Sequence, residues 1–271
     1  MDTDTTTLIT GGGTGIGLEM ARLLAARGHR LVLVSRDAGR LQKAADELSR
    51  AHGIEAHAHA VDLSEPGAAQ RLFERTRRQG LRIDGLVNNA GFGVLDEHVD
   101  MDAAQLRRML QLNVVAVAEL CHRYGGEMRR RRTGRILNVA STAAFQPTPY
   151  FAAYGAAKAF VLNFSEALAM EMEDHGVSVG CLAPGPTDTA FFDAVDPRRI
   201  AGSHHFGKAG RADPRDVAAA GVALMLDGGL TRVVGLTNRL AALSNRFAPR
   251  AMVAAVSKRL LRPLDPSATT P

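Results

Sequence analysis

The sequence lacks tryptophan, has only two cysteines, and contains no long apolar run in its 271 positions. Cys121 and Cys181 cannot build a disulfide framework, so we expect a reducing compartment and a cytoplasmic location. Residues 1–7 lack the basic and apolar segments of a secretory signal peptide, and none is expected. No apolar run reaches the roughly 18 residues that a membrane-spanning helix needs.

Aromatic residues are also scarce, at 5% of the chain, whereas hydrophobic residues make up 46%. The core is therefore expected to be large and aliphatic. The formal net charge is +5, but arginine is dispersed apart from a run at 129–132 and a basic C-terminal region. Dispersed arginine is typical of a solvated surface, so no nucleic-acid partner is expected, although a basic protein suits anionic small molecules.

Short apolar runs alternate with longer segments of helical periodicity. This alternation predicts an α/β protein with a doubly wound Rossmann fold, in which a seven-stranded parallel sheet is flanked by helices in a single domain. Strands are predicted at 6–10, 30–35, 54–61, 83–88, 135–140, 177–183 and 231–236. Helices are predicted at 15–27, 38–51, 64–78, 114–131, 154–175 and 215–226. Residues 1–236 would form the catalytic domain, 237–262 a helical extension and 263–271 a tail.

The extension at 238–262 combines apolar faces with basic residues. The apolar positions are Leu240, Leu243, Phe247, Met252, Val253, Val256 and Leu260, and arginines or lysines flank them. One interpretation is a helix pair packed on its own domain or on a second subunit. The other is attachment to a membrane surface, or burial of a lipid-like substrate.

A glycine-rich turn at 10–17 follows the first predicted strand and opens a helix. At such a position backbone N–H groups and the positive helix end can face a pyrophosphate. Glycine is required where a Cβ would block the turn, the approach of the cofactor or close helix–strand packing. The spacing is G-x3-G-x-G rather than G-x-G-x-x-G. The predicted contacts come from Gly11, Gly13, Thr14, Gly15, Ile16 and Gly17.

The end of the second strand indicates which dinucleotide would bind. An acidic residue there would bind the ribose 2′-hydroxyl, whereas arginine would pair with a 2′-phosphate. The chain has Ser35, Arg36 and Asp37 at this point, which favours NADP(H). Asp37 would favour NAD instead, but it precedes a predicted helix and is also a suitable N-cap.

A tyrosine and a lysine are suitably spaced for proton transfer. Tyr154 and Lys158 lie one helical turn apart, so both project from one face. A phenol is a poor base at neutral pH, and a neighbouring ammonium would favour its phenolate. Ser141 would hold the substrate oxygen near the phenol.

These residues belong to a series of short motifs that follow one another along the chain. The motifs are the turn at 10–17, Asp62-Leu63, Asn88-Asn89-Ala90-Gly91, Asn113, Ser141, Tyr154-x3-Lys158, Pro184-Gly185, Thr187 and Thr189. With these motifs in this order, residues 6–236 resemble the short-chain dehydrogenase/reductase family, in particular bacterial ketoreductase-like members with a basic C-terminal extension.

The resemblance implies roles that the residues alone do not establish. It implies that Lys158 also contacts the nicotinamide ribose and that Asn113 holds a water molecule that relays protons. Asp62 and Leu63 would lie at the adenine, Asn89, Ala90 and Gly91 along the adenosine ribose, and Pro184, Gly185, Thr187 and Thr189 at the carboxamide. It also implies a homodimer or homotetramer, with the helices at 114–131 and 154–175 between subunits.

The expected activity is reversible hydride transfer between NADP(H) and a carbonyl or secondary alcohol (EC 1.1.1.-), with Tyr154 as general acid and base. An apolar ketone or 3-oxoacyl substrate is favoured, because phenylalanines fall on segments around the nicotinamide end. These are Phe92, Phe145, Phe151, Phe191 and Phe192. The alternative is a dinucleotide-binding sensor or membrane-associated scaffold with little turnover.

No metal site is expected. His57 and His59 alternate along one strand, but no further ligand joins them at a suitable spacing, so solvated or interfacial histidines are the preferred interpretation. His204 and His205 fall in a predicted loop near the mouth of the active site, where they could contact substrate.

Overall fold

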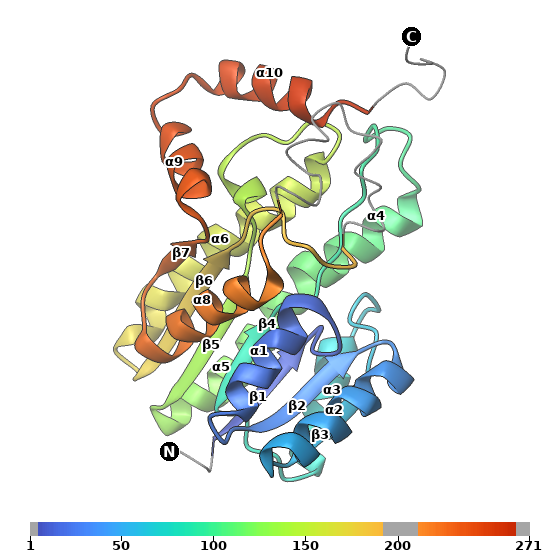
Figure 1. Ribbon diagram of the computed structural model, residues 1–271, viewed down its shortest axis with the longest axis vertical. Coiled ribbons are helices and arrows are strands. Elements are labelled where there is room, and N and C mark those ends of the chain that lie inside the picture. Colours follow the sequence, from blue (N-terminus) through green and yellow to red (C-terminus); the bar gives the residue numbers. More distant parts are fainter. Residues whose placement is uncertain (1–4, 192–210, 264–271) are drawn as a thin grey trace.

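The computed structural model describes residues 5–191 and 211–263. Its strands form the predicted parallel sheet of seven, in the order β3-β2-β1-β4-β5-β6-β7 (Figure 1). The order reverses direction beside β1, which makes the sheet doubly wound. The strands are β1 (Thr6–Thr10), β2 (Arg30–Ser35), β3 (Ala56–Ala60), β4 (Gly85–Asn88), β5 (Gly134–Val139), β6 (Val177–Ala183) and β7 (Thr231–Val233).

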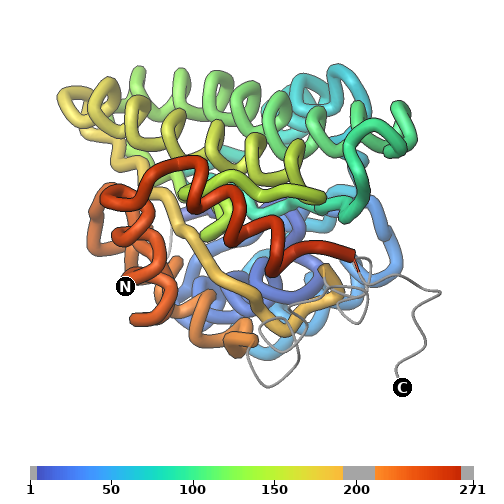
Figure 2. Tube along the Cα trace, turned by 90° about the horizontal axis from the view of Figure 1, so that it is seen from above, coloured from blue at the N-terminus to red at the C-terminus, as the bar shows by residue number. Residues whose placement is uncertain are grey.

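Helices cover both faces of the sheet, as Figure 2 shows from the end of the strands. One layer consists of α1 (Gly15–Ala25), α2 (Ala38–His52) and α8 (Pro214–Asp227). The other consists of α3 (Ala68–Arg78), α5 (Ala116–Arg131) and α6 (Ala152–Glu173). Each layer buries its own aliphatic core against the sheet, so every central strand is apolar on both faces.

Strand β2 illustrates this two-sided burial. Leu31 and Leu33 point into the core under α1 and α2, while Val32 and Val34 point into the core on the opposite face. All four side chains are fully buried. A continuous apolar run, rather than an alternating one, is what a central parallel strand requires.

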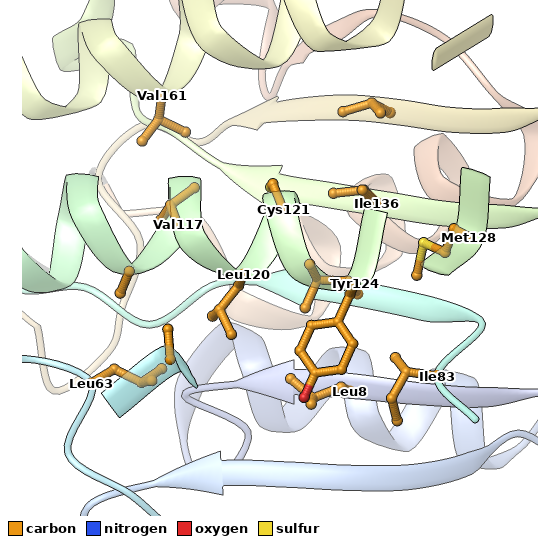
Figure 3. Packing of buried hydrophobic residues seen from close by; sticks show 14 of the residues in the cluster. Leu8, Leu63, Ile83, Val117, Leu120, Cys121, Tyr124, Met128, Ile136 and Val161 are labelled. Atoms are coloured by element: carbon orange, nitrogen blue, oxygen red, sulfur yellow. The ribbon is translucent and has the colours of Figure 1, made fainter. Parts of the chain in front are cut away.

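The core beneath α3 and α5 contains one tyrosine, Tyr124 of α5. Its ring packs among Leu8, Ile83 and Leu120, and its hydroxyl lies 3.0 Å from the Thr76 hydroxyl (Figure 3). Burial raises the pKa of this phenol, although the hydrogen bond with Thr76 opposes the shift. Tyr124 is thus a neutral structural residue whose polar end is satisfied.

A helical segment at 103–115 was not predicted from the sequence. It comprises α4 (Ala103–Leu110), capped by the Asp102 carboxylate, and a π-helical turn η1 (Gln111–Val115) that runs into α5. The predicted start at 114 was therefore wrong. Helix α4 has only eight residues, fewer than the window of roughly 11–18 residues over which helical periodicity is recognised, so the pattern did not identify it.

The other predicted boundaries shift by a few residues. The helix predicted from 64 begins at Ala68, because Gly67 adopts the left-handed conformation with φ +73°. The strand predicted to end at 236 ends at Val233, since Gly235 (φ +89°) turns the chain directly into helix α9 (Leu236–Ser244). Such positive φ angles are accessible to glycine at little cost.

Helix α9 is followed by α10 (Arg250–Leu261), and the pair lies across the carboxyl end of the sheet (Figures 1 and 2). Ala242 of α9 and Ser257 of α10 are buried, whereas Leu240, Phe247 and Met252 are exposed. In residues 5–191 and 211–263 no helix has the length and apolar character needed to cross a bilayer. The predictions for Phe192, His204, His205 and most of the tail lie outside the described residues.

Candidate functional site

A cavity of about 740 Å³ opens where the strands end. Residues that follow β1, β2, β4, β5 and β6 form its walls, as expected for the carboxyl edge of a doubly wound sheet. Gly17 and Asn113 do not line it. The predicted site residues that do are Gly11, Gly13, Thr14, Gly15, Ile16, Ser35, Arg36, Asp62, Leu63, Asn89, Ala90, Gly91, Ser141, Tyr154, Lys158, Pro184, Gly185, Thr187 and Thr189.

The turn after β1 has the conformation of an anion-binding loop. Gly11 (φ +68°) and Gly15 (φ +53°) adopt left-handed backbone conformations. Thr14 is the N-cap residue of α1, yet its side chain makes no capping bond, and the first turn of α1 has no acidic residue. The first N–H groups of α1 therefore have no side-chain acceptor and meet the cavity with the positive end of the helix dipole. A dinucleotide pyrophosphate fits these properties.

Gly17 lies behind the turn rather than on the cavity surface. A Cβ there would collide with the Gly11 carbonyl oxygen and would lie 2.5 Å from Asn89 Nδ2. Gly17 thus permits α1 to pack closely against the loop that follows β4. The structure thus gives Gly17 a packing role, and the direct cofactor contact expected for it stays a prediction.

Thr10 ties the ends of β1 and β4 together. Its hydroxyl oxygen accepts hydrogen bonds of 3.0 Å from the backbone N–H groups of Asn89 and Ala90. The Asn89 side-chain amide donates to the Thr10 carbonyl oxygen at 2.9 Å. These bonds hold the Asn89–Gly91 wall of the cavity against the glycine-rich turn.

The end of β2 presents two arginines to the cavity, Arg36 and Arg40. Asp37 caps α2, because its Oδ1 accepts a 3.0 Å hydrogen bond from the Arg40 backbone N–H. Its second oxygen lies 3.5 Å from Arg40 Nε. The N-cap interpretation of Asp37 is confirmed. Arg40 was not among the site residues predicted from the sequence, although its position in the first turn of α2, close to Arg36, could have indicated that it faces the same cavity.

Asp62, which follows β3, is held by polar partners. Its carboxylate accepts hydrogen bonds from the Ser64 backbone N–H (2.9 Å) and hydroxyl (2.6 Å) and pairs with Arg108 Nη2 at 2.8 Å. Burial favours the protonated form, but these hydrogen bonds, Arg108 and Arg36 together lower the pKa of Asp62. Asp62 therefore meets the cavity as a fixed carboxylate. Arg108, on α4, was not predicted.

Tyr154 and Ser141 face the cavity from different elements. Tyr154 lies on α6, and Ser141 caps the 3₁₀ turn η2 (Thr142–Phe145) by accepting a 3.1 Å bond from the Ala143 N–H. Burial raises the pKa of Tyr154 to about 12, while a hydrogen bond with Ser141 opposes the shift. The phenol is therefore protonated at neutral pH. The lowering of this pKa that was expected from Lys158 is not seen in this structure, where burial and the Ser141 hydrogen bond determine the shift.

Lys158 lies one helical turn beyond Tyr154 and is buried. Its Nζ donates a 2.9 Å hydrogen bond to the Val139 carbonyl oxygen and lies 5.7 Å from the centroid of the Tyr154 ring. Burial lowers the pKa of Lys158 from 10.5 to about 8, with a smaller opposing contribution from Cys181. A cation is thus held beside the phenol at neutral pH.

The buried ammonium predicts a pH dependence of stability. Between about pH 8 and pH 10.5 the folded protein has released this proton while the unfolded chain still holds it. The unfolding free energy should therefore rise with pH across this interval, by about 3 kcal/mol for this group. Lys158→Met should lose that part of the rise in denaturant titrations, whereas Lys43→Met, at an exposed lysine of α2, should keep it. Identical pH profiles for wild type and Lys158→Met would contradict the burial of a charged Lys158.

Asn113 lies in the π-helical turn η1, behind Gly91. Its Nδ2 donates a 2.7 Å hydrogen bond to the Phe92 carbonyl oxygen, but its Oδ1 is buried without a partner. A Cβ on Gly91 would lie 2.5 Å from that Oδ1 and 3.4 Å from Lys158 Nζ. Asn113 Oδ1 is therefore a buried, unpaired acceptor close to Lys158, and glycine at position 91 keeps a Cβ away from it.

Apolar side chains surround the phenol. Phe92, Phe151 and Phe191 line the cavity as predicted, and Tyr154 lies between Phe151 and Phe191, with ring centroids 5.1 and 5.5 Å away. Phe145 does not line it, because it packs against the core beneath α5 and α6. Helix α10 adds three residues that the sequence did not indicate, Ser257, Leu260 and Leu261.

The two histidines of β3 have different surroundings. His59 is buried rather than solvated, and burial together with the nearby Arg75 and His57 lowers its pKa to about 4. His57 Nε2 lies 3.1 Å from Glu55. In the part of the chain that the structure describes, no three histidine, cysteine or acidic side chains are grouped as metal ligands.

Comparison with known proteins gives consistent relatives. Residues 5–199 match the model of the short chain dehydrogenase family. A probable oxidoreductase, EphD, of Mycobacterium tuberculosis is 34% identical over 187 residues, which cover 69% of this chain and 31% of the relative. Mouse 17-beta-hydroxysteroid dehydrogenase type 3 is 34% identical over 179 residues, 65% of this chain and 58% of the relative. The chain thus spans about a third to just over half of these relatives' lengths.

Solved structures resemble the whole chain. A short-chain dehydrogenase from Sphingobium yanoikuyae in complex with NADPH has a TM-score of 0.78 at 28% identity and covers 98% of both chains. A bulky-bulky ketone specific alcohol dehydrogenase from Comamonas testosteroni has a TM-score of 0.75 at 25% identity, over 98% of this chain and 97% of that one. With the family match over most of the chain, these likenesses show that the protein belongs to the short-chain dehydrogenase family of oxidoreductases.

Proposed function

We propose that the protein is an NADP(H)-dependent oxidoreductase that reduces a carbonyl or oxidises a secondary alcohol (EC 1.1.1.-). The observation that carries this proposal is that Ser141, Tyr154 and Lys158 meet on the wall of the same cavity that the glycine-rich turn lines. Ser141 lies just after β5, Tyr154 and Lys158 lie on α6, and the turn follows β1. A proton donor and a dinucleotide site therefore share one enclosed space.

Carbonyl reduction needs a hydride on carbon and a proton on oxygen. Bound NADPH would supply the hydride. Tyr154 would donate its proton to the substrate oxygen, since burial keeps its phenol protonated. Ser141 would donate a hydrogen bond to the same oxygen and so place it at the phenol. In alcohol oxidation Tyr154 would take the proton back.

Lys158 and Asn113 would support proton transfer at Tyr154. The Lys158 ammonium, 5.7 Å from the ring centroid, would stabilise the negative charge left on the phenol oxygen. Asn113 Oδ1, buried and unpaired, would accept a hydrogen bond from a water close to Lys158. Such a water could replace the proton that Tyr154 gives up.

The cofactor would extend along the carboxyl ends of the strands. The turn at 11–16 would hold the pyrophosphate. Asp62, Leu63 and the Asn89–Gly91 wall would hold the adenosine, and Pro184, Gly185, Thr187 and Thr189 the carboxamide end. Arg36 and Arg40 would bind the 2′-phosphate, with Ser35 leaving room for it. The NADPH complex of the Sphingobium relative supports this choice of cofactor.

Arg36→Ala tests the 2′-phosphate site. Loss of one charge-assisted contact should weaken NADPH binding by about tenfold while leaving NADH binding unchanged. The measurement is fluorescence titration with both cofactors. Arg50→Ala, at an exposed arginine further along α2, is the matched control and should bind both like wild type. A wild type that binds NADH as well as NADPH would refute the proposed specificity.

The substrate is proposed to be an apolar ketone or a 3-oxoacyl compound. Phe92, Phe151 and Phe191 surround the phenol with apolar surface, and α10 adds Leu260 and Leu261. Such a lining favours substrates that lose little hydration when they are buried. Relatives named for steroid, bulky ketone and very-long-chain 3-oxoacyl-CoA substrates support this class. Purified enzyme that reduced only sugars or polyols would contradict it.

The proposed assembly is a cytoplasmic homodimer or homotetramer that contacts neighbours through α5 and α6. Helix α6 supports this assembly because it exposes the apolar side chains of Phe160 and Met170. The Phe160 ring stacks on Phe164, which leaves a flat apolar surface. Sedimentation equilibrium would measure the mass, and a monomer at micromolar concentration would contradict the assembly.

A further inference from the structure

The outer surface of α9 and α10 is apolar and uncovered. We call it the C-terminal face and define it by seven large apolar side chains, which are between 40% and 83% exposed. Folded proteins rarely leave so many large apolar side chains together in water. The seven are Leu236, Leu240, Leu243, Phe247, Met252, Val256 and Leu260.

The spacing of these residues aligns them along the helices. Leu236, Leu240 and Leu243 are four and three residues apart in α9, and Met252 and Val256 are four apart in α10. Such intervals place side chains on one side of a helix. The inner sides are occupied by small residues, Ala242 in α9 and Ser257 in α10, both of which are buried. Most of the large apolar residues of the two helices are therefore exposed, although Leu260 and Leu261 also line the cavity.

The charge around this face has one sign. The sequence contains no aspartate or glutamate from 228 to 263. The six cations of α9, α10 and their flanks are all exposed, and none is in an ion pair with any residue in the ranges 5–191 and 211–263. These cations are Arg239, Arg246, Arg250, Lys258, Arg259 and Arg262.

We propose that the C-terminal face binds the surface of an anionic lipid membrane. Leucine and phenylalanine on one side of a helix, with arginine and lysine around them, are the features of helices that lie in a bilayer interface. The basic residues would meet anionic headgroups while the apolar side chains enter the acyl boundary. A symmetric pairing with a second copy is less favourable, because it would place two sets of unpaired cations against each other.

The face also borders the cavity, since Leu260 belongs to both. Binding to a membrane would therefore place one edge of the cavity at the lipid surface, where apolar compounds concentrate. The inference goes beyond the proposed reaction and does not depend on it. Membrane binding can be measured without turnover.

Vesicle flotation of the full chain tests the proposal. The protein should float with vesicles of phosphatidylcholine mixed with phosphatidylserine and remain unbound with phosphatidylcholine alone. Arg246→Gln combined with Arg250→Gln should weaken binding by about fivefold per charge. Phe247→Gln should weaken it by about tenfold. High salt should weaken the wild type.

Matched controls separate the C-terminal face from general effects. Val99 is 86% exposed and is therefore comparable with Phe247, which is 83% exposed. Because Val99 lies in an acidic loop away from α9 and α10, Val99→Gln should bind vesicles like wild type. Arg78→Gln with Arg129→Gln removes two exposed cations elsewhere and should also bind like wild type. Circular dichroism melting would show that each variant is folded. The proposal would be overturned if the wild type did not float with the anionic vesicles. It would also be overturned if Phe247→Gln lost the mass of a dimer while its flotation was unchanged.

Discussion

Tyr154→Phe is expected to lower kcat by about 10²- to 10⁴-fold, which is the usual contribution of a positioned general acid. The substitution removes only the hydroxyl, so the ring contacts with Phe151 and Phe191 stay. NADPH binding should persist, because the turn and the Asn89–Gly91 wall are untouched. Steady-state ketone reduction and fluorescence titration of NADPH would measure the two effects separately.

Tyr150→Phe is the matched control for this variant. Tyr150 lies four residues earlier and does not line the cavity, so its loss should leave kcat near the wild-type value. A wild type that binds NADPH tightly but turns over no carbonyl or alcohol would instead support a dinucleotide-binding sensor. Equal activity in wild type and Tyr154→Phe would remove Tyr154 from the reaction.

Gly17→Ala is expected to destabilise the protein by about 3 kcal/mol, the upper part of the usual range for overpacking. The added Cβ would collide with the Gly11 carbonyl oxygen and approach Asn89 Nδ2. The Gly11 oxygen is part of the backbone, and Asn89 Nδ2 is hydrogen-bonded to the Thr10 carbonyl oxygen, so neither atom can move without opening the turn. Urea unfolding would measure the stability, and NADPH affinity should fall with it.

Gly126→Ala is the control, because it also adds one Cβ to a helix. A Cβ at Gly126 of α5 meets no atom within 4 Å. Since alanine favours the helix over glycine, this variant should be more stable by about 0.5–1 kcal/mol. If Gly17→Ala were as stable as wild type, the packing of α1 against the Asn89–Gly91 wall would have to be loose enough to accept a Cβ.

Most of the sheet could be predicted because its strands are short, aliphatic and separated by helices with clear apolar stripes. The segment at 103–115 could not, because its α-helix of eight residues is too short for periodicity to identify. Phe145 was misplaced for a related reason. Its position after β5 is near the site in sequence, but η2 directs the side chain into the core beneath α6.

The pKa values at the site depended on burial. From sequence, Lys158 was expected to lower the pKa of Tyr154, whereas the structure raises it to about 12 because the phenol is desolvated among phenylalanines. The same burial lowers the pKa of Lys158. Sequence spacing fixes which groups are neighbours, but desolvation depends on residues far away in the chain.

The sequence by itself determined the seven strands, most of the helices, the glycine-rich turn and the Tyr154–Lys158 pair, because each depends on residues close together in the chain. Only the tertiary structure decided that Arg108 pairs with Asp62, that Gly17 and Asn113 lie behind the wall of the cavity, and that α10 lines it. Those contacts join segments separated by tens to hundreds of residues, and packing rather than local pattern selects them.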